Sequence, residues 1–236
     1  MRNRVYENLC LYKIFAKKFD HGNGGKWIKA PNTQLTEDTY NLIVDWNETG
    51  YFNKRHDQLE MAIDAPNFLP IGKDVLVNIA TDTQYLGYEW VKSLFPDSKF
   101  HIMKCTEAHL DGEFMCLKPG VFLANKRFSP FINQLPEKFQ KWKFLIPENL
   151  PTNIDVSRFT DIGIRLASSS GMDVNVLSLD ENTVLVSKRA IGTKKILEKN
   201  GFSVIDVDLD YGEVFSGGIH CSTLDLIRDD NYDFYT

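Results

Sequence analysis

The sequence predicts an α/β fold, in the α+β arrangement, in which a unit of one β-hairpin, one helix and one strand is repeated along the chain. Two observations support this prediction. Three segments share the pattern of an apolar run, a turn and a second apolar run that ends in Asn or Ser. An acidic residue precedes the second run of each segment at a nearly constant distance. We interpret the pattern as a threefold repeat of one supersecondary unit.

The three hairpins are expected at residues 68–78, 115–125 and 176–187. Glycine, proline or asparagine stands at the turn of each one, where these residues suit tight backbone geometry. The acidic residues that precede the hairpins are Asp64, Asp111 and Asp173.

Helix and strand patterns follow the first and third hairpins. Thr81 and Asp82 are expected to cap the first helix, and a strand is predicted at 100–103. Thr193 is expected to cap the second helix, which Gly201 ends before a strand at 202–207. The two units are therefore built alike.

The middle unit and the front of the chain are less regular. The region 128–160 contains Pro130, Pro136, Pro147 and Pro151, which limit the length of any helix there. An apolar stripe at three- and four-residue spacings predicts an amphipathic helix at 4–19, and a short helix is expected around 38–45.

Composition excludes several classes of protein. The 27 Lys and Arg stand against 32 Asp and Glu, a net charge of −5, and no basic block suggests nucleic-acid binding. No apolar run reaches the roughly 18 residues that a membrane span needs. Met1–Arg4 is not followed by the apolar stretch of a signal peptide, so we expect none. We expect a soluble, cytoplasmic protein of a single domain over residues 1–236. Its four cysteines have neither disulfide-framework nor zinc spacing.

A glycine pair precedes the most reactive candidate side chain. In the string 217–223, Gly217 and Gly218 allow close approach of the backbone to a ligand, and Cys221 is a candidate nucleophile. The alternative is a buried structural thiol beside a surface histidine, His220. We expect Cys10, Cys105 and Cys116 to be small core residues.

Several polar side chains could act together with that thiol. His109 and Asp111 would share one face of an extended segment, although a strand-edge ion pair is the alternative. Asp64 stands at a turn, where it could instead form a local Asx bond. The hydroxyls of 168–170 either bind a ligand or belong to a flexible loop. His109 and His220 occupy similar places in successive units, so all these groups would converge if the units surround an axis.

Together these strings resemble the amidinotransferase family, with the closest match to its glycine-using members. The matching strings cover essentially the whole chain and run in the order of the family. They are KWIKAPN at 26–32, DAPNFLPIGKDV at 64–75, TQYLGYEW at 83–90, HLDGEF at 109–114, KPGVFLAN at 118–125, MDVNVLSLDE at 172–181 and GGIHCSTLD at 217–225.

The resemblance implies a pentein fold, a pseudo-symmetric propeller of ββαβ modules around an axis, which here lacks a counterpart to the first module. The implied reaction moves the amidino group of L-arginine to an amine, with glycine as the expected acceptor, through a covalent amidino-cysteine. Guanidinoacetate and ornithine would be the products, and no metal or organic cofactor is implied.

The resemblance also implies site residues. In the family an arginine binds the carboxylate of the donor; strict counting places this position at Phe128, and Arg127 is the nearest arginine. By family position the catalytic residues are Asp64, His109 and Cys221, and the substrate-binding residues are Asp111, Arg127, Ser168 and Ser169.

Two other functions remain open. Water would replace the amine in a related arginine-modifying hydrolase. A non-catalytic arginine-binding remnant is the other alternative. The expected partners are the small-molecule substrates, with no nucleic acid and no membrane, together with a separately encoded N-terminal module or further copies of the chain.

Overall fold

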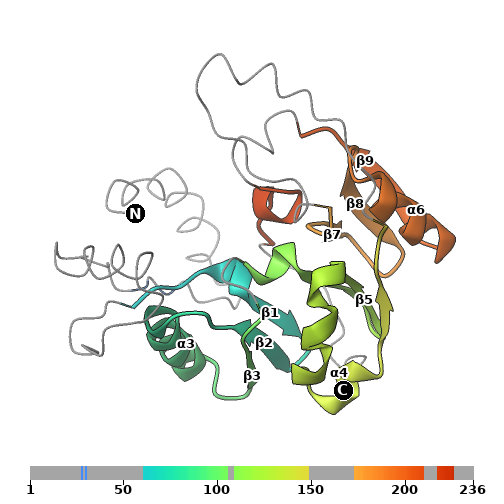
Figure 1. The fold of residues 1–236 in the computed structure, drawn as a ribbon. Coiled ribbons are helices and arrows are strands. Elements are labelled where there is room, and N and C mark those ends of the chain that lie inside the picture. Colours follow the sequence, from blue (N-terminus) through green and yellow to red (C-terminus); the bar gives the residue numbers. More distant parts are fainter. Residues whose placement is uncertain are drawn as a thin grey trace, which may run out of the picture. The chain divides into compact units, whose positions relative to one another are not determined.

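The computed structural model describes residues 28, 30, 61–105, 109–148, 173–209 and 217–225 (Figure 1). The chain divides into two compact units, one made of residues 1–62 and 82–87 and the other of residues 63–81 and 88–236. The described strands all lie in the second unit. In the first unit, the N–H of Ala62 donates to the carbonyl of Thr83 over 3.0 Å. The helices predicted at 4–19 and 38–45 lie outside the described residues.

Three sheets of three strands share one topology in the second unit. In each sheet an antiparallel hairpin is followed by a third strand that pairs in parallel with the second strand of the hairpin. This arrangement confirms the predicted threefold repeat. The strands are β1 (Phe68–Ile71), β2 (Asp74–Asn78) and β3 (Lys99–Met103); β4 (Phe114–Lys118), β5 (Val121–Ala124) and β6 (Lys143–Leu145); and β7 (Leu177–Ser178), β8 (Thr183–Ser187) and β9 (Ser203–Val207).

Left-handed glycines shape the turns, as the sequence pattern predicts. Gly72 and Gly120 close the first two hairpins with φ of 59° and 81°. A side chain at either position would be strained, because L-residues rarely adopt positive φ.

A crossover joins each hairpin to its parallel third strand, as parallel pairing requires. Helix α3 (Asp82–Leu94) crosses in the first module and α6 (Ile191–Lys199) in the third. The middle module instead uses a 3-10 segment, η5 (Lys126–Gln134), and one short helix, α4 (Glu137–Gln140). Pro130 lies inside η5 and Pro136 caps α4, which confirms that prolines limit helix length in this module.

The predicted cap of the last crossover helix is wrong. Helix α6 begins at Ile191, with Ala190 at its N-cap and no capping side chain. Thr193, completely buried in the first turn, donates its hydroxyl to the carbonyl of Asp173 over 2.6 Å. The hydroxyl therefore ties the helix to the segment that leads into the third hairpin.

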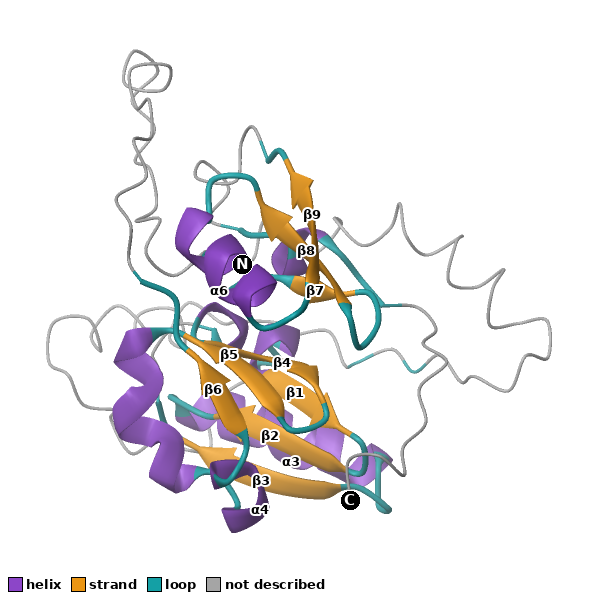
Figure 2. Ribbon diagram, turned by 90° about the vertical axis from the view of Figure 1, so that its right-hand side faces the viewer, coloured by secondary structure: helices purple, strands orange, loops and turns teal. Residues whose placement is uncertain are grey.

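The middle sheet packs against two hydrophobic clusters. Phe122 on β5 belongs to a cluster with side chains of the first sheet, whereas the next residue, Leu123, belongs to a cluster with side chains of β8 and α6. Successive strand residues point to opposite faces, so the middle sheet is buried on both faces and joins the modules into one core. Figure 2 shows the third sheet with α6 packed beside it.

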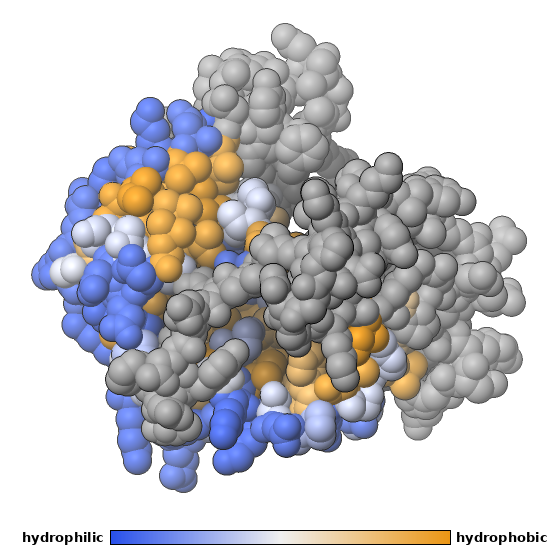
Figure 3. Space-filling view, turned by 180° about the vertical axis from the view of Figure 1, so that it is seen from behind, coloured by the Kyte–Doolittle hydropathy of each residue, from blue (hydrophilic) through white to orange (hydrophobic). Residues whose placement is uncertain are grey.

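The outer strands keep one side toward solvent. Ile102 on β3 and Ile205 on β9 are nearly half exposed. Hydrophilic and apolar side chains both contribute to the face shown in Figure 3. Among the helices that the structure describes, none combines the length and the apolar character needed to cross a bilayer.

Candidate active site

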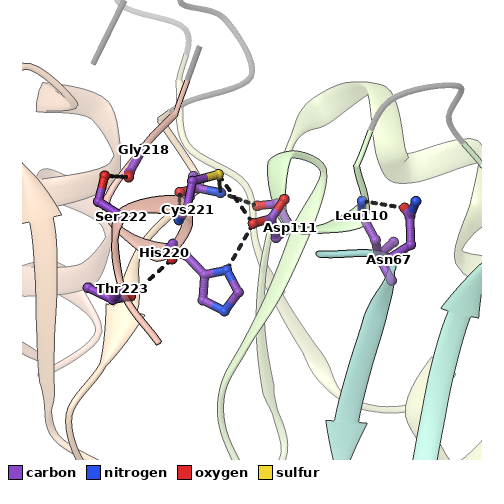
Figure 4. Close-up of polar contacts among 9 residues, drawn as sticks. Asn67, Leu110, Asp111, Gly218, His220, Cys221, Ser222 and Thr223 are labelled. Carbon is purple, nitrogen blue, oxygen red and sulfur yellow. Dashed lines mark hydrogen bonds and ion pairs between the residues drawn. The ribbon is translucent and has the colours of Figure 1, made fainter. Parts of the chain in front are cut away.

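The Cys221 sulfur lies between an amide and a carboxylate from two other segments (Figure 4). Cys221 is in a 3-10 turn, η7 (His220–Ser222), that is held by the bond from the Thr223 N–H to the His220 carbonyl. The Nδ2 of Asn175 donates to Sγ over 3.3 Å, and the thiol donates to Oδ2 of Asp111 over 3.4 Å. The turn thus presents the thiol directly to a carboxylate.

Asp111 is the buried anion of the site. It lies in the 3-10 turn η4 (Leu110–Gly112), is 4% exposed, and its Oδ2 is 2.8 Å from Nδ1 of His220. Burial by itself raises the pKa of Asp111, but the hydrogen bond and positive charge of His220 outweigh burial, so this pKa lies below its ordinary value. The carboxylate is therefore ionised at neutral pH and suited to bind a cation.

The carboxylate of Asp111 also affects the pKa of the Cys221 thiol, which it raises. Burial raises the pKa of Cys221, and the negative charge of Asp111 raises it further. The resting thiol is therefore protonated at neutral pH. A cationic ligand on Asp111 would cancel part of this effect, so thiolate formation is coupled to occupation of the carboxylate.

The two glycines before Cys221 make room for protein side chains. A Cβ on Gly218 would lie 2.6 Å from Cβ and 2.8 Å from Cγ of Asn175, and one on Gly217 would lie 3.2 Å from Cβ of Cys221. We expected this pair to admit a ligand. In the structure, Gly218 instead allows Asn175 to reach the thiol.

The expectation that His109 and Asp111 share a face of an extended segment is wrong. His109 is exposed at the start of η4, whereas Asp111 is buried inside this turn, because the chain leaves the extended conformation at Leu110. Asp64 is half-buried and precedes the turn η3 (Ala65–Asn67), and its backbone carbonyl accepts the N–H of Asn67 over 2.9 Å. The side chain of Asp64 makes no capping hydrogen bond to this turn, so the Asx alternative is not observed. The turns η3 and η4 pack together and are joined by the bond from the Leu110 N–H to Oδ1 of Asn67, 3.0 Å long.

The chain is similar to several amidinotransferases in both sequence and structure. Inosamine-phosphate amidinotransferase 1 of Streptomyces glaucescens is 28% identical over 239 residues, covering 100% of this chain and 64% of that protein. Mitochondrial glycine amidinotransferase of Xenopus tropicalis is 29% identical, covering 96% of this chain and 54% of that protein. SxtG, an amidinotransferase of the saxitoxin pathway from Microseira wollei, has a solved structure that superposes with a TM-score of 0.78 at 28% identity, covering 100% of this chain and 66% of that one. The chain therefore resembles amidinotransferases in sequence and in fold.

No family model matches the chain. The resemblance rests on these relatives. The structural similarity, together with the repeated ββαβ modules, confirms the predicted pentein fold. The chain spans between 54% and 64% of the length of the two curated relatives.

The other residues predicted to bind substrate lie in different parts of the structure. Nε of Arg127 donates to Oε2 of the buried Glu113 over 2.6 Å, while half of the arginine side chain is exposed. Its neighbour Phe128 is in the core, stacked on Phe114 at 4.6 Å between ring centroids. Of the two neighbours, only Arg127 is therefore placed to meet a ligand. Ser168 and Ser169 lie outside the described residues.

Asn175 was not among the predicted residues of the site, and His220 was expected to converge on it but was given no role there. Asn175 contacts both the sulfur and the backbone of Cys221, and His220 pairs with Asp111. Sequence comparison of the modules offered a signal for each, since Asn67 also precedes a hairpin and His109 occupies the place of His220 in an earlier module. A pattern of spacing does not reveal which side chains meet across modules.

The other two described thiols, Cys105 and Cys116, lie against the hydrophobic core. Both are half-buried against the first hydrophobic cluster, which agrees with the prediction of core residues. Burial raises the pKa of Cys105 to about 12, so this thiol is protonated at neutral pH. Cys10 lies outside the described part of the chain. Within that part, no group of three or more His, Cys, Asp or Glu side chains is arranged to hold a metal ion.

Proposed function

We propose that the protein transfers an amidino group from L-arginine to an amine through a covalent intermediate on Cys221. The observation that carries this proposal is the position of the Cys221 sulfur, 3.4 Å from the ionised, buried carboxylate of Asp111. A guanidinium bound to that carboxylate by charge-assisted hydrogen bonds would bring its carbon close to the sulfur.

Binding of the donor would also prepare the nucleophile. The positive guanidinium offsets the Asp111 charge that raises the pKa of Cys221, and thiolate formation therefore becomes easier when the donor is present. His220 shares Oδ2 of Asp111 in the resting site and is one-third exposed, so it is able to yield that oxygen to the donor. Asp64 supplies a second carboxylate, and Arg127 anchors the carboxylate of the donor.

The first half-reaction forms a C–S bond and breaks a C–N bond. Cys221 first loses its proton to solvent as the donor binds. The thiolate then adds to the guanidinium carbon, and the resulting tetrahedral adduct expels the amine of ornithine. Protonated His109 donates the proton that the departing nitrogen needs. The product left on the enzyme is an amidino group in thioester-like linkage to Sγ.

The second half-reaction reverses the first with another amine. Neutral His109 removes a proton from the incoming amine, whose nitrogen attacks the amidino carbon, and the C–S bond breaks to return the thiolate. We propose glycine as the acceptor because the sequence motifs resemble those of glycine-using amidinotransferases. Guanidinoacetate is then the product.

The test is to incubate the protein with L-arginine, labelled at the guanidino carbon, and with glycine. We expect ornithine and labelled guanidinoacetate, and in the absence of acceptor we expect a mass increase of one amidino group on the peptide that carries Cys221. Cys221→Ser is the matched control and should show neither the product nor the adduct.

Other outcomes would change the proposal. Adduct formation without transfer to glycine, but with transfer to another amine, would reject glycine and keep the amidinotransferase. Citrulline in place of ornithine would indicate that water attacks the donor carbon, as in a hydrolase. Arginine binding without adduct or product would reject catalysis by this chain.

A further inference from the structure

Asn175 has both ends of its side-chain amide engaged at Cys221. Its Oδ1 accepts the N–H of Cys221 over 3.1 Å, and its Nδ2 donates to Sγ over 3.3 Å and to the carbonyl of Asp111 over 3.2 Å. The Cys221 backbone N–H is only a donor and the Asp111 carbonyl only an acceptor, so they determine the orientation of the amide. The N–H group therefore faces the sulfur.

The position of this amide is held from several sides. Asn175 is 2% exposed, and its neighbours Val174 and Val176 are both in the second hydrophobic cluster. Its own carbonyl accepts the N–H of Ile219 over 3.1 Å, and Gly218 leaves no space for it to move in that direction. A buried, packed and fully bonded side chain is suited to hold a reactive atom in place.

In the first module Asn67 makes a similar hydrogen bond to the backbone, but it does not contact a sulfur atom. There Oδ1 of Asn67 accepts the N–H of Leu110, the residue after His109, just as Oδ1 of Asn175 accepts the N–H of Cys221, the residue after His220. The Nδ2 of Asn67 is buried and has no hydrogen-bond partner among the described residues. Holding the loop therefore requires only the amide oxygen, and the N–H···S contact of Asn175 is an additional feature of the third module.

We propose that Asn175 is a positioning residue that donates a hydrogen bond to the Cys221 thiolate and directs the sulfur toward a guanidinium on Asp111. A hydrogen bond to the charged form of a group favours that form, so the amide stabilises the thiolate against the carboxylate beside it. The proposal rests on the proposed function of Cys221 as nucleophile. It adds a residue that touches the sulfur but not the donor.

The experiment compares Asn175→Asp and Asn175→Ala with wild-type protein and with Asn78→Asp. Asn78 is a buried asparagine of the first module that bonds Asn67 and Cys105 and does not contact Cys221, so Asn78→Asp is a matched control for the cost of altering a buried amide. The rate of alkylation of Cys221 by iodoacetamide is measured by peptide mass spectrometry from pH 6 to pH 10, and folding is checked by circular dichroism and thermal melting.

We expect both Asn175 variants to alkylate at least about tenfold more slowly at neutral pH, with the rate profile displaced to higher pH, which is the size expected for one lost hydrogen bond to a charged group. Asn78→Asp should keep the wild-type profile even if its melting temperature falls. A wild-type profile in either folded Asn175 variant would overturn the proposal, as would an equal displacement in Asn78→Asp. Asn175→Asp is isosteric, and Asn175→Ala adds no charge, so one variant remains informative if the other fails to fold.

Alkylation does not depend on turnover, so the two proposals fail separately. A displaced profile in a protein that never transfers an amidino group would reject the function and keep the positioning role. Normal amidino transfer by wild type, together with an alkylation profile that is not displaced in the Asn175 variants, would keep the function and reject the positioning role. If both proposals hold, the variants lose kcat while KM for arginine stays near the wild-type value.

Discussion

Gly218→Ala perturbs the site by adding one methyl group beside Asn175. The new Cβ would lie 2.6 Å from Cβ and 2.8 Å from Cγ of Asn175 and would overlap its amide oxygen, whereas ordinary contact begins at 3.4 Å. The asparagine side chain would have to retreat by roughly 0.8 Å to reach normal carbon–carbon separation. Its hydrogen bonds to Sγ and to the Cys221 N–H, 3.3 and 3.1 Å long, cannot survive that shift unchanged.

Two magnitudes follow from this displacement. Overpacking of a closely packed site costs about 1–3 kcal/mol of stability. A misplacement of about 1 Å at a reacting group costs on the order of 100-fold in rate. We therefore expect Gly218→Ala to remain folded with a lower melting temperature, and to lose most of its turnover and much of its Cys221 alkylation at neutral pH.

The assay needs a control that strains the backbone elsewhere. Gly120→Ala meets this need, because Gly120 has a φ of 81° in the turn between β4 and β5 and no atom within 4 Å of an added Cβ. It should lose about 1–2 kcal/mol of stability and keep wild-type Cys221 reactivity. Folded Gly218→Ala protein with wild-type alkylation and turnover would refute the reasoning that this glycine exists to admit Asn175.

Three further substitutions test the charges and the packing. Asp111→Asn removes the charge that raises the pKa of Cys221, so Cys221 alkylation at neutral pH should become faster while transfer from arginine falls; slower alkylation would contradict this. Burial raises the pKa of Asp74, but hydrogen bonds and charge from Lys138 and His101 outweigh burial and lower this pKa. The ionised carboxylate therefore stabilises the fold above pH 3.8, its ordinary pKa, and this stabilisation is lost as the pH falls through the lowered pKa. The gap in unfolding free energy between wild type and Asp74→Asn should therefore shrink below about pH 4, and a gap independent of pH would show that the charge does not matter. Gly192→Ala places a Cβ against the backbone carbonyl of Glu148, which cannot rotate away. The free energy of unfolding should therefore fall by about 1–3 kcal/mol, and the alkylation rate of Cys221 should not change.

Local patterns were sufficient to predict the modules. The alternation of apolar residues around Gly72 and Gly120 predicted hairpins that the structure contains, because strand pairing and turn geometry depend on neighbouring residues. The prediction failed at Thr193, whose side chain could either cap its helix or bond a distant carbonyl. The structure contains the second arrangement, a contact to Asp173 that sequence spacing does not encode.

The candidate site could be predicted only in part. The string around Cys221 and the acidic residue Asp111 were identified from residue type and module position, and the structure brings the two side chains together. The extended geometry expected for His109 and Asp111 was wrong, since the 3-10 turn η4 buries Asp111 and leaves His109 exposed. The catalytic and substrate-binding roles stay predictions for all the predicted site residues, which are Asp64, His109, Asp111, Arg127, Ser168, Ser169 and Cys221.

The sequence by itself determined the repeated ββαβ modules, the resemblance to amidinotransferases and the identity of the candidate nucleophile, because these depend on local periodicity and on short strings of residues. Only the tertiary structure decided which side chains surround the thiol. Asn175, Asp111 and Cys221 come from segments separated by 46 to 110 residues, and their contacts exist only after the modules pack around a shared core. The protonation of the thiol is likewise a tertiary property, because it depends on burial and on the charge of Asp111.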